Sequence, residues 1–157
     1  MRWAWVVVMA LLAALLQVSL LGSWRVEGAV LNLALVMVLL LAFTRSASEA
    51  ILVALVAGIV LDATSGGQFG LATSSLVCVG LLAMASRQAG VQTGEWLVRT
   101  ALLMAATILW GSVHIATAGI SQLALIDSWR VLFVEAGMNC AVGLILWRGF
   151  TGGRRTL

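Results

Sequence analysis

A small set of polar side chains interrupts an otherwise apolar chain, and these are the side chains that could do chemistry. A serine beside a histidine base is the pattern of nucleophilic catalysis, paired carboxylates can act as acid and base, and amides bind ligands or other helices. A metal site is not supported, because the single His and the two Cys lie in separate apolar segments. The candidate residues are Asn32, Asp62, Ser65, His114, Glu135 and Asn139.

The densest group of these residues lies at positions 58–71, where the sequence reads GIVLDATSGGQFGL. Asp62 and Ser65 can accept hydrogen bonds from free backbone N–H groups near helix ends. The glycine pair that starts at Gly66 permits positive φ, and Gly70 permits a close approach of two backbones. A loop this short at a membrane surface needs internal partners for its backbone groups. The pattern therefore predicts a tight, capped reversal between two helices.

Two enzymatic interpretations of this segment stay open. The stretch that ends in Ser65-Gly66 is similar to the Gly-x-Ser-Gly of rhomboid intramembrane proteases, and His114 on a later segment could be the base of a Ser-His dyad. Such a protease also needs an oxyanion hole, for which only loop amides are candidates. A pairing of Asp62 with Asp127 is similar to lipoprotein signal peptidase, but the motifs that flank those aspartates are missing. We therefore expect no enzymatic activity.

The composition places the whole chain in a membrane. Of its 157 residues, 62% are hydrophobic and 10% are charged, and the mean hydropathy is +1.12. Soluble domains are about half apolar and about a quarter charged, so this chain cannot surround a core with a solvated surface. A transmembrane helix takes about 20 apolar residues, so the length accommodates about six of them and no soluble catalytic or nucleic-acid-binding domain. We expect a single all-α integral membrane domain over residues 1–157, with no cofactor and no nucleic-acid partner.

Polar residues divide the chain into six apolar segments, which we expect to be six transmembrane helices. The segments are 3–21, 26–43, 47–61, 69–86, 96–118 and 131–150. An even number of spans places both termini on one side of the membrane. If that side is cytoplasmic, it carries Arg2, Arg45, Arg87, Arg99, Arg148, Arg154 and Arg155, against Arg25 and Arg130 outside. The positive-inside rule therefore favours cytoplasmic termini.

With this orientation, most membrane-embedded polar side chains fall in the outer half of the bundle. They are Gln17, Asn32, Asp62, Thr73, Ser74, Ser75, His114, Glu135 and Asn139. An ionisable group in the hydrocarbon zone costs at least about 2.5 kcal/mol and normally faces the bundle interior or a wet cavity. We therefore predict a polar cavity that opens to the extracytoplasmic side. Asp62 lies near enough to the interface to be simply hydrated, whereas His114 and Glu135 lie deeper.

Small residues recur every four positions along the third segment, at Ala50, Ala54 and Gly58, and the next position in the series is Asp62. Residues four apart share one face of a helix, and small residues let two helix backbones approach closely. The stripe therefore predicts packing against a neighbouring helix, with Asp62 at the outer end of that contact.

The same residues carry a resemblance to a known family. The pattern Gly58-x-x-x-Asp62-x-x-Ser65-Gly66-x-x-x-Gly70-Leu71 resembles the signature of the MreD family of rod shape-determining membrane proteins. Other stretches agree with it, namely Leu16-Gln17-x-Ser19, Gly28-Ala29-x-x-Asn32-Leu33 and Glu135-x-x-x-Asn139. The length and the six-segment layout are also similar, so the resemblance covers essentially the whole chain.

The resemblance implies a non-enzymatic scaffold of the bacterial cell-elongation complex, located in the cytoplasmic (inner) membrane and supporting peptidoglycan synthesis. The implied partner is the bitopic protein MreC, in a complex with the glycosyltransferase RodA, a penicillin-binding transpeptidase and, indirectly, the actin-like MreB filament. The implied fold is similar to the six-helix S components of vitamin transporters. Asp62, Ser65, Gly66 and Gly70 would then shape the outer loop and cavity, with Asn32, Glu135 and Asn139 as weaker matches.

A transport function is the main alternative. An S-component-like protein would use the same fold and the same polar cavity to bind a small molecule, and it would associate with an energising transmembrane subunit instead of MreC. Membrane lipid surrounds the protein on either interpretation. The segment from Asp62 to Gly70 is the only part of the sequence that separates the two.

Overall fold

The chain is all-helical in the computed structural model, which describes residues 2–65, 69–90, 96–117 and 122–152. The described part is 87% helix and contains no strand, which confirms the predicted all-α class. The helices are α1 (Arg2–Leu16), which continues as the π-helical turn η1 (Gln17–Leu21), α2 (Leu33–Thr44), α3 (Ala47–Ser65), α4 (Leu71–Gln88), α5 (Trp96–Thr117) and α6 (Gln122–Gly152).

Five of the described helical segments are long and apolar enough to cross a membrane, so the chain is a multi-pass membrane protein. They are Trp3–Leu21, Ala47–Thr64, Leu71–Gln88, Trp96–Thr117 and Ser128–Gly149. The expected sixth span is not confirmed, because α2 has only 12 residues. At 1.5 Å per residue it is about 18 Å long, which is short of a hydrocarbon layer of about 30 Å.

The predicted segment 26–43 is a loop followed by a helix. Glu27 and Gly28 have positive φ, at 50° and 87°, and they turn the chain back before α2 begins at Leu33. Hydropathy cannot distinguish the loop from the helix that follows it, because both consist mainly of apolar residues. The sixth segment differs in the opposite direction, since α6 begins at Gln122 and not near position 131. Polar residues end an apolar run there without ending the helix.

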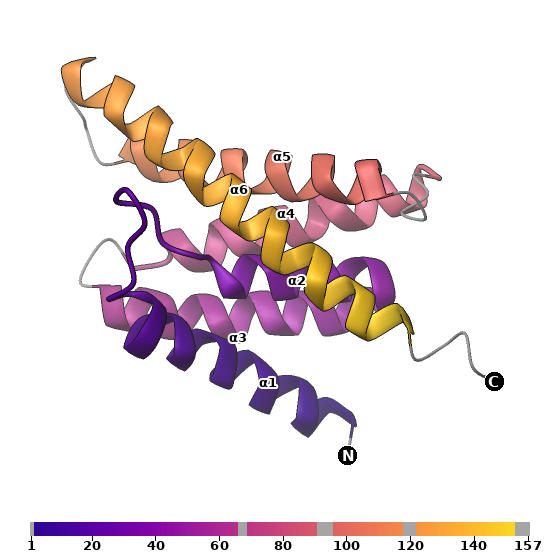
Figure 1. The fold of residues 1–157 in the computed structure, drawn as a ribbon. Helices are drawn as coiled ribbons and strands as arrows, with labels where there is room; N and C mark the ends of the chain where they lie inside the picture. The colour runs from indigo at the N-terminus through magenta and orange to yellow at the C-terminus, as the bar shows by residue number, and fades with distance from the viewer. Residues whose placement is uncertain (1, 66–68, 91–95, 118–121, 153–157) are drawn as a thin grey trace.

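Helix α2 lies at the centre of the bundle and contacts every other helix (Figure 1). All its residues from Ala34 to Phe43 are buried. A helix that is apolar on every side must be surrounded by lipid or by other protein elements, and the other helices surround α2. This explains how a helix too short to span the bilayer forms part of a membrane protein.

The start of α1 and the end of α6 lie at one end of the bundle, which also holds the end of α4 and the start of α5 (Figure 1). Arg87 donates to the carbonyl oxygens of Ala42 and Arg45, at 3.3 and 2.8 Å, and so caps the C-terminus of α2. The Arg99 guanidinium lies over the Trp147 ring, 4.9 Å from its centroid. We call this the arginine end, and the opposite end, which carries Arg25, Asp62 and Gly70, the motif end.

Candidate functional site

Asp62 joins α3 to the first turn of α4. Its carboxylate accepts hydrogen bonds from the backbone N–H of Ala72 at 2.8 Å, from the backbone N–H of Thr73 at 3.0 Å and from the Thr73 hydroxyl at 2.6 Å. These two N–H groups belong to the first turn of a helix and have no partner within it. Asp62 is only 4% exposed. The side chain of one helix therefore caps the N-terminus of the next.

Two glycines of the motif make this cap possible. A Cβ atom added at Gly58 would lie 2.5 Å from the Thr73 Cα, so α3 and α4 are in backbone contact one turn before Asp62. Gly70 does not serve the predicted close approach of two backbones, because nothing lies within 4 Å of its added Cβ. It has instead a φ of +95°, a left-handed conformation that directs the chain into α4. The predicted close contact of the stripe with a neighbouring helix is thus confirmed at Gly58, with α4 as that neighbour. We call the contacts among Gly58, Asp62, Gly70 and Thr73 the α3–α4 junction.

The close contact at Gly58 leads to a stability prediction. We expect Gly58→Ala to lower the free energy of unfolding in detergent by about 1–3 kcal/mol, because the new methyl group forces α3 away from α4. Gly137→Ala on α6 is the matched control, since nothing lies within 4 Å of its added Cβ; it should be neutral or stabilise by up to about 1 kcal/mol. Denaturant unfolding followed by tryptophan fluorescence measures both. Equal stability of the two variants would contradict a tight junction.

A second set of contacts links four elements through three buried polar residues and the half-buried Gln17. Asn139 on α6 accepts a hydrogen bond from the Asn32 backbone N–H at 2.8 Å and donates to the Thr107 hydroxyl on α5 at 3.1 Å. Gln17 at the start of η1 donates to the Asn32 side-chain oxygen at 3.3 Å. Asn139 and Thr107 are both 0% exposed. We call these four residues the interior network.

The interior network satisfies the start of α2. The Asn32 side chain accepts from the backbone N–H of Leu35 at 3.1 Å, and the Gln17 side chain accepts from that of Ala34 at 3.0 Å. Without such acceptors the free N–H groups of a helix that begins inside the protein would be buried and unpaired, which costs several kcal/mol in a membrane interior. Asn32 and Asn139 therefore position helices.

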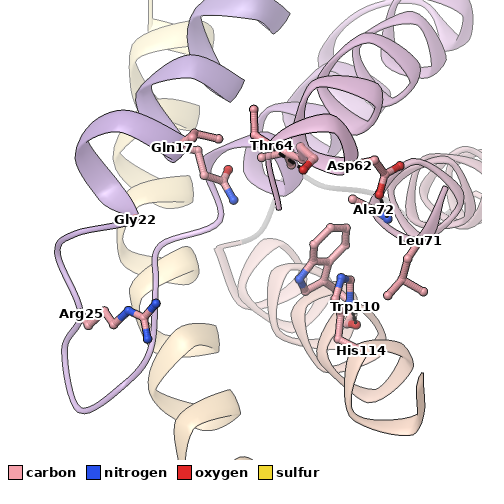
Figure 2. A pocket seen from close by; sticks show the side chains of 11 residues that line it. Gln17, Gly22, Arg25, Asp62, Thr64, Leu71, Ala72, Trp110 and His114 are labelled. Atoms are coloured by element: carbon pink, nitrogen blue, oxygen red, sulfur yellow. Dashed lines mark hydrogen bonds between the residues drawn. The ribbon is translucent and has the colours of Figure 1, made fainter. Parts of the chain in front are cut away.

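A cavity of about 500 Å³ opens at the motif end, beside both sets of contacts (Figure 2). Its polar lining comes from Gln17, Arg25, Asp62, Thr64 and His114, and its apolar lining includes Val18, Leu61, Leu71 and Trp110. We call it the outer cavity, after the side that the sequence predicts for it. It brings three of the predicted cavity residues together, namely Gln17, Asp62 and His114.

His114 and Trp110 form one wall of the outer cavity (Figure 2). The His114 Nδ1 lies 2.9 Å from the Trp110 carbonyl oxygen, and the two ring centroids are 4.3 Å apart. When Nδ1 donates this hydrogen bond, the neutral ring keeps Nε2 as an acceptor. His114 is thus fixed in orientation while part of it is accessible from the cavity.

Arg25 reaches the outer cavity from a hairpin. Val26 and Ala29 exchange two backbone hydrogen bonds, at 3.0 and 2.9 Å, around the turn at Glu27 and Gly28. An exposed ion pair of 3.2 Å joins Glu27 to Arg130 on α6. Arg25 itself forms no ion pair with another described residue. From its sequence context Arg25 is expected only to be a flanking charge, although Glu27 and Gly28 just after it are a usable turn signal.

The remaining predicted residues lie elsewhere. Glu135 lines a separate pocket between α5 and α6, and Asn32 and Asn139 lie in the interior network. The single predicted cavity is therefore three environments, because the direction in which a helix face points depends on its neighbours. Gly66 and the side chain of Ser65 lie outside the described residues, as does the side chain of Asp127, so neither the Ser-His dyad nor the aspartate pair is tested.

Comparison with protein-family models, with curated proteins and with solved structures finds no match for this chain. The described residues hold no cluster of three or more His, Cys, Asp or Glu side chains that could bind a metal ion. What the geometry offers is a set of polar contacts between helices and two pockets that share Trp110 and His114. Such an arrangement can bind another molecule or another helix.

Proposed function

We propose that the chain is a non-enzymatic membrane scaffold of the MreD type, which binds MreC within the bacterial cell-elongation complex. One observation carries the proposal: five of the residues on which the resemblance rests are residues that join helices. Gly58, Asp62 and Gly70 form the α3–α4 junction, and Asn32 and Asn139 belong to the interior network. Polar groups that hold helices together in this way support a binding surface and not a catalytic centre.

The proposed orientation places both termini in the cytoplasm. Arg87 and Arg99 lie at the arginine end, whereas Arg25 and Arg130 belong to the other side of the bundle. Positively charged residues accumulate on the cytoplasmic side of multi-pass proteins. The motif end would then face the extracytoplasmic side of the inner membrane, where peptidoglycan synthesis takes place. RodA and the transpeptidase would be neighbours in the complex, and MreB an indirect partner.

Co-purification tests this scaffold function. We expect the tagged full-length chain, co-expressed with MreC and solubilised in mild detergent, to elute with MreC as one species on size exclusion. An unrelated multi-pass protein carrying the same tag controls for non-specific association. Absence of MreC at matched expression, together with recovery of an energising transporter subunit and its ATPases, would contradict the proposal.

An S-component-like solute binder is the second candidate, and the outer cavity favours it. Its volume of about 500 Å³ falls within the range of small-molecule sites, about 300–1,000 Å³. On this proposal Arg25 and His114 would contact the solute, so Arg25→Gln should weaken saturable solute binding about tenfold or more. Thr100→Ala at the far end of α5 is a suitable control.

A further inference from the structure

A groove lies between the outer parts of α5 and α6, separate from the α3–α4 junction. It has a volume of about 510 Å³, and its lining includes Trp110, His114, Ile115, Val131, Leu132 and Glu135. His114, Ile115 and Glu135 are half-buried, so the groove is open at the protein surface. At the base of the groove α5 and α6 are in close contact at Gly111. A Cβ atom added to this residue would overlap the Leu132 side chain. We call it the α5–α6 groove.

Glu135 is the feature of this groove that needs explanation. It forms no hydrogen bond or ion pair with another described residue. It lies seven residues after Ser128, the first residue of the apolar part of α6, and therefore about 10 Å further along the helix axis. By contrast, Asp62 and Asn139 have hydrogen-bond partners inside the chain. A carboxyl group in the hydrocarbon zone normally has a partner or marks a functional site.

The depth of Glu135 in the membrane and its need for a hydrogen-bond donor determine which kind of molecule could occupy the groove. A lipid headgroup stays at the membrane surface, and an acyl chain has no hydrogen-bond donor for the carboxyl group. A soluble peptide does not enter the hydrocarbon layer. A membrane-spanning helix can bring a donor to this depth, and its apolar side chains can pack against Trp110, Ile115 and Leu132. Polar side chains in membranes commonly form hydrogen bonds between helices in this way.

We propose that the α5–α6 groove binds a single transmembrane helix of a partner protein, and that Glu135 pairs with a side-chain hydrogen-bond donor of that helix. The donor would be a hydroxyl, amide or basic side chain about 10 Å below the membrane surface. The inference rests on the proposed scaffold function, because it assigns that function a binding surface. It also states the chemistry by which the partner is recognised.

Photo-crosslinking in native membranes tests the groove. A photoreactive amino acid replaces Ile115 in the full-length chain, and Leu81, an exposed residue of α4, is the control position. We expect the probe at position 115 to crosslink to a membrane-spanning segment of another protein, identified by mass spectrometry, and the probe at position 81 not to do so. The crosslink should weaken about 3- to 30-fold in the Glu135→Leu background, which corresponds to loss of one interhelical hydrogen bond.

Two further variants distinguish a specific effect of Glu135→Leu from a folding defect. Phe133→Trp keeps the carboxyl group and changes an exposed residue of the same helix, so it should leave the crosslink unchanged. Conversely, Val131→Trp should block the crosslink by filling the groove while Glu135 stays in place. Denaturant unfolding of each variant shows whether it folds. Crosslinks from position 115 only to lipid, or only to a second copy of this chain, would overturn the proposal.

The crosslinking experiment and the MreC co-purification can succeed or fail independently. If MreC co-purifies but no partner helix crosslinks at position 115, the groove assignment fails and the scaffold function stands. If the crosslinked helix belongs to a different protein and MreC does not co-purify, the groove assignment stands and the MreC function fails. The two experiments therefore report on different claims.

Discussion

Replacing Asp62 with Ala is expected to lower the free energy of unfolding by about 3–5 kcal/mol, because it leaves several hydrogen-bond donors without an acceptor. The backbone N–H groups of Ala72 and Thr73 and the Thr73 hydroxyl all donate to this carboxylate. Asp62 is only 4% exposed although it borders the outer cavity, so water from that cavity replaces the lost acceptor only in part. The carboxylate also lies at the N-terminus of α4, where the helix dipole favours negative charge. Loss of Asp62 should therefore loosen the first turn of α4.

Denaturant unfolding in detergent micelles, with tryptophan fluorescence as the signal, measures this change. Asp62→Asn keeps one oxygen acceptor and should be affected less, by about 1–2 kcal/mol. Thr64→Ala is the matched control, because Thr64 is exposed and its hydroxyl bonds only to carbonyls of its own helix, those of Val60 and Leu61. It should change stability by at most about 0.5 kcal/mol. An Asp62→Ala protein as stable as Thr64→Ala would refute the capping role.

Replacing Asn139 with Leu should destabilise the protein by about 2–4 kcal/mol, although the two side chains are similar in size. The change removes the acceptor for the Asn32 N–H and the donor to the Thr107 hydroxyl. Because Asn139 is fully buried, the Asn32 N–H would remain unpaired inside the bundle, whereas the Thr107 hydroxyl would keep only its own hydrogen bond to the Leu103 carbonyl oxygen. The start of α2 would then lose one of the contacts that fix it in the interior.

A double-mutant cycle isolates the contact between Asn139 and Thr107. Asn139→Leu, Thr107→Val and the double variant should show a coupling of about 0.6 kcal/mol, the average for hydrogen bonds between membrane helices, and at most about 1.7 kcal/mol. Ala141→Leu on the exposed face of α6 is the control and should be close to neutral. A coupling near zero would mean that the hydrogen bond does not stabilise the fold.

Asp62 and Asn139 both act in helix packing, which is consistent with the proposed scaffold function. The α3–α4 junction and the interior network each use polar side chains to fix helix ends. The two sets lie beside the outer cavity, whose lining includes Asp62 and Gln17. A change in either set should therefore alter the shape of the motif end, and any binding there would be weakened indirectly.

The sequence by itself determined the class of protein and most of its helices. An apolar fraction of 62% excludes a soluble domain, and the segments that became α3, α4 and α5 are bounded by polar residues near the positions where the helices end. The four-residue spacing from Ala50 to Asp62 also predicted a close contact at one helix face. These properties depend on composition and on the helical repeat, and both can be counted along the chain.

Only the tertiary structure decided which neighbour each polar side chain meets. Asn32 and Asn139 lie 107 positions apart in the chain but are hydrogen-bonded, whereas Glu135, four residues before Asn139, lies in a separate groove. The start of α2 at Leu33 likewise depends on acceptors from η1 and α6. Hydropathy describes how a residue partitions between water and lipid. The positions of distant helices determine its partners inside the bundle. They therefore decide whether a polar residue lines a cavity or caps a helix.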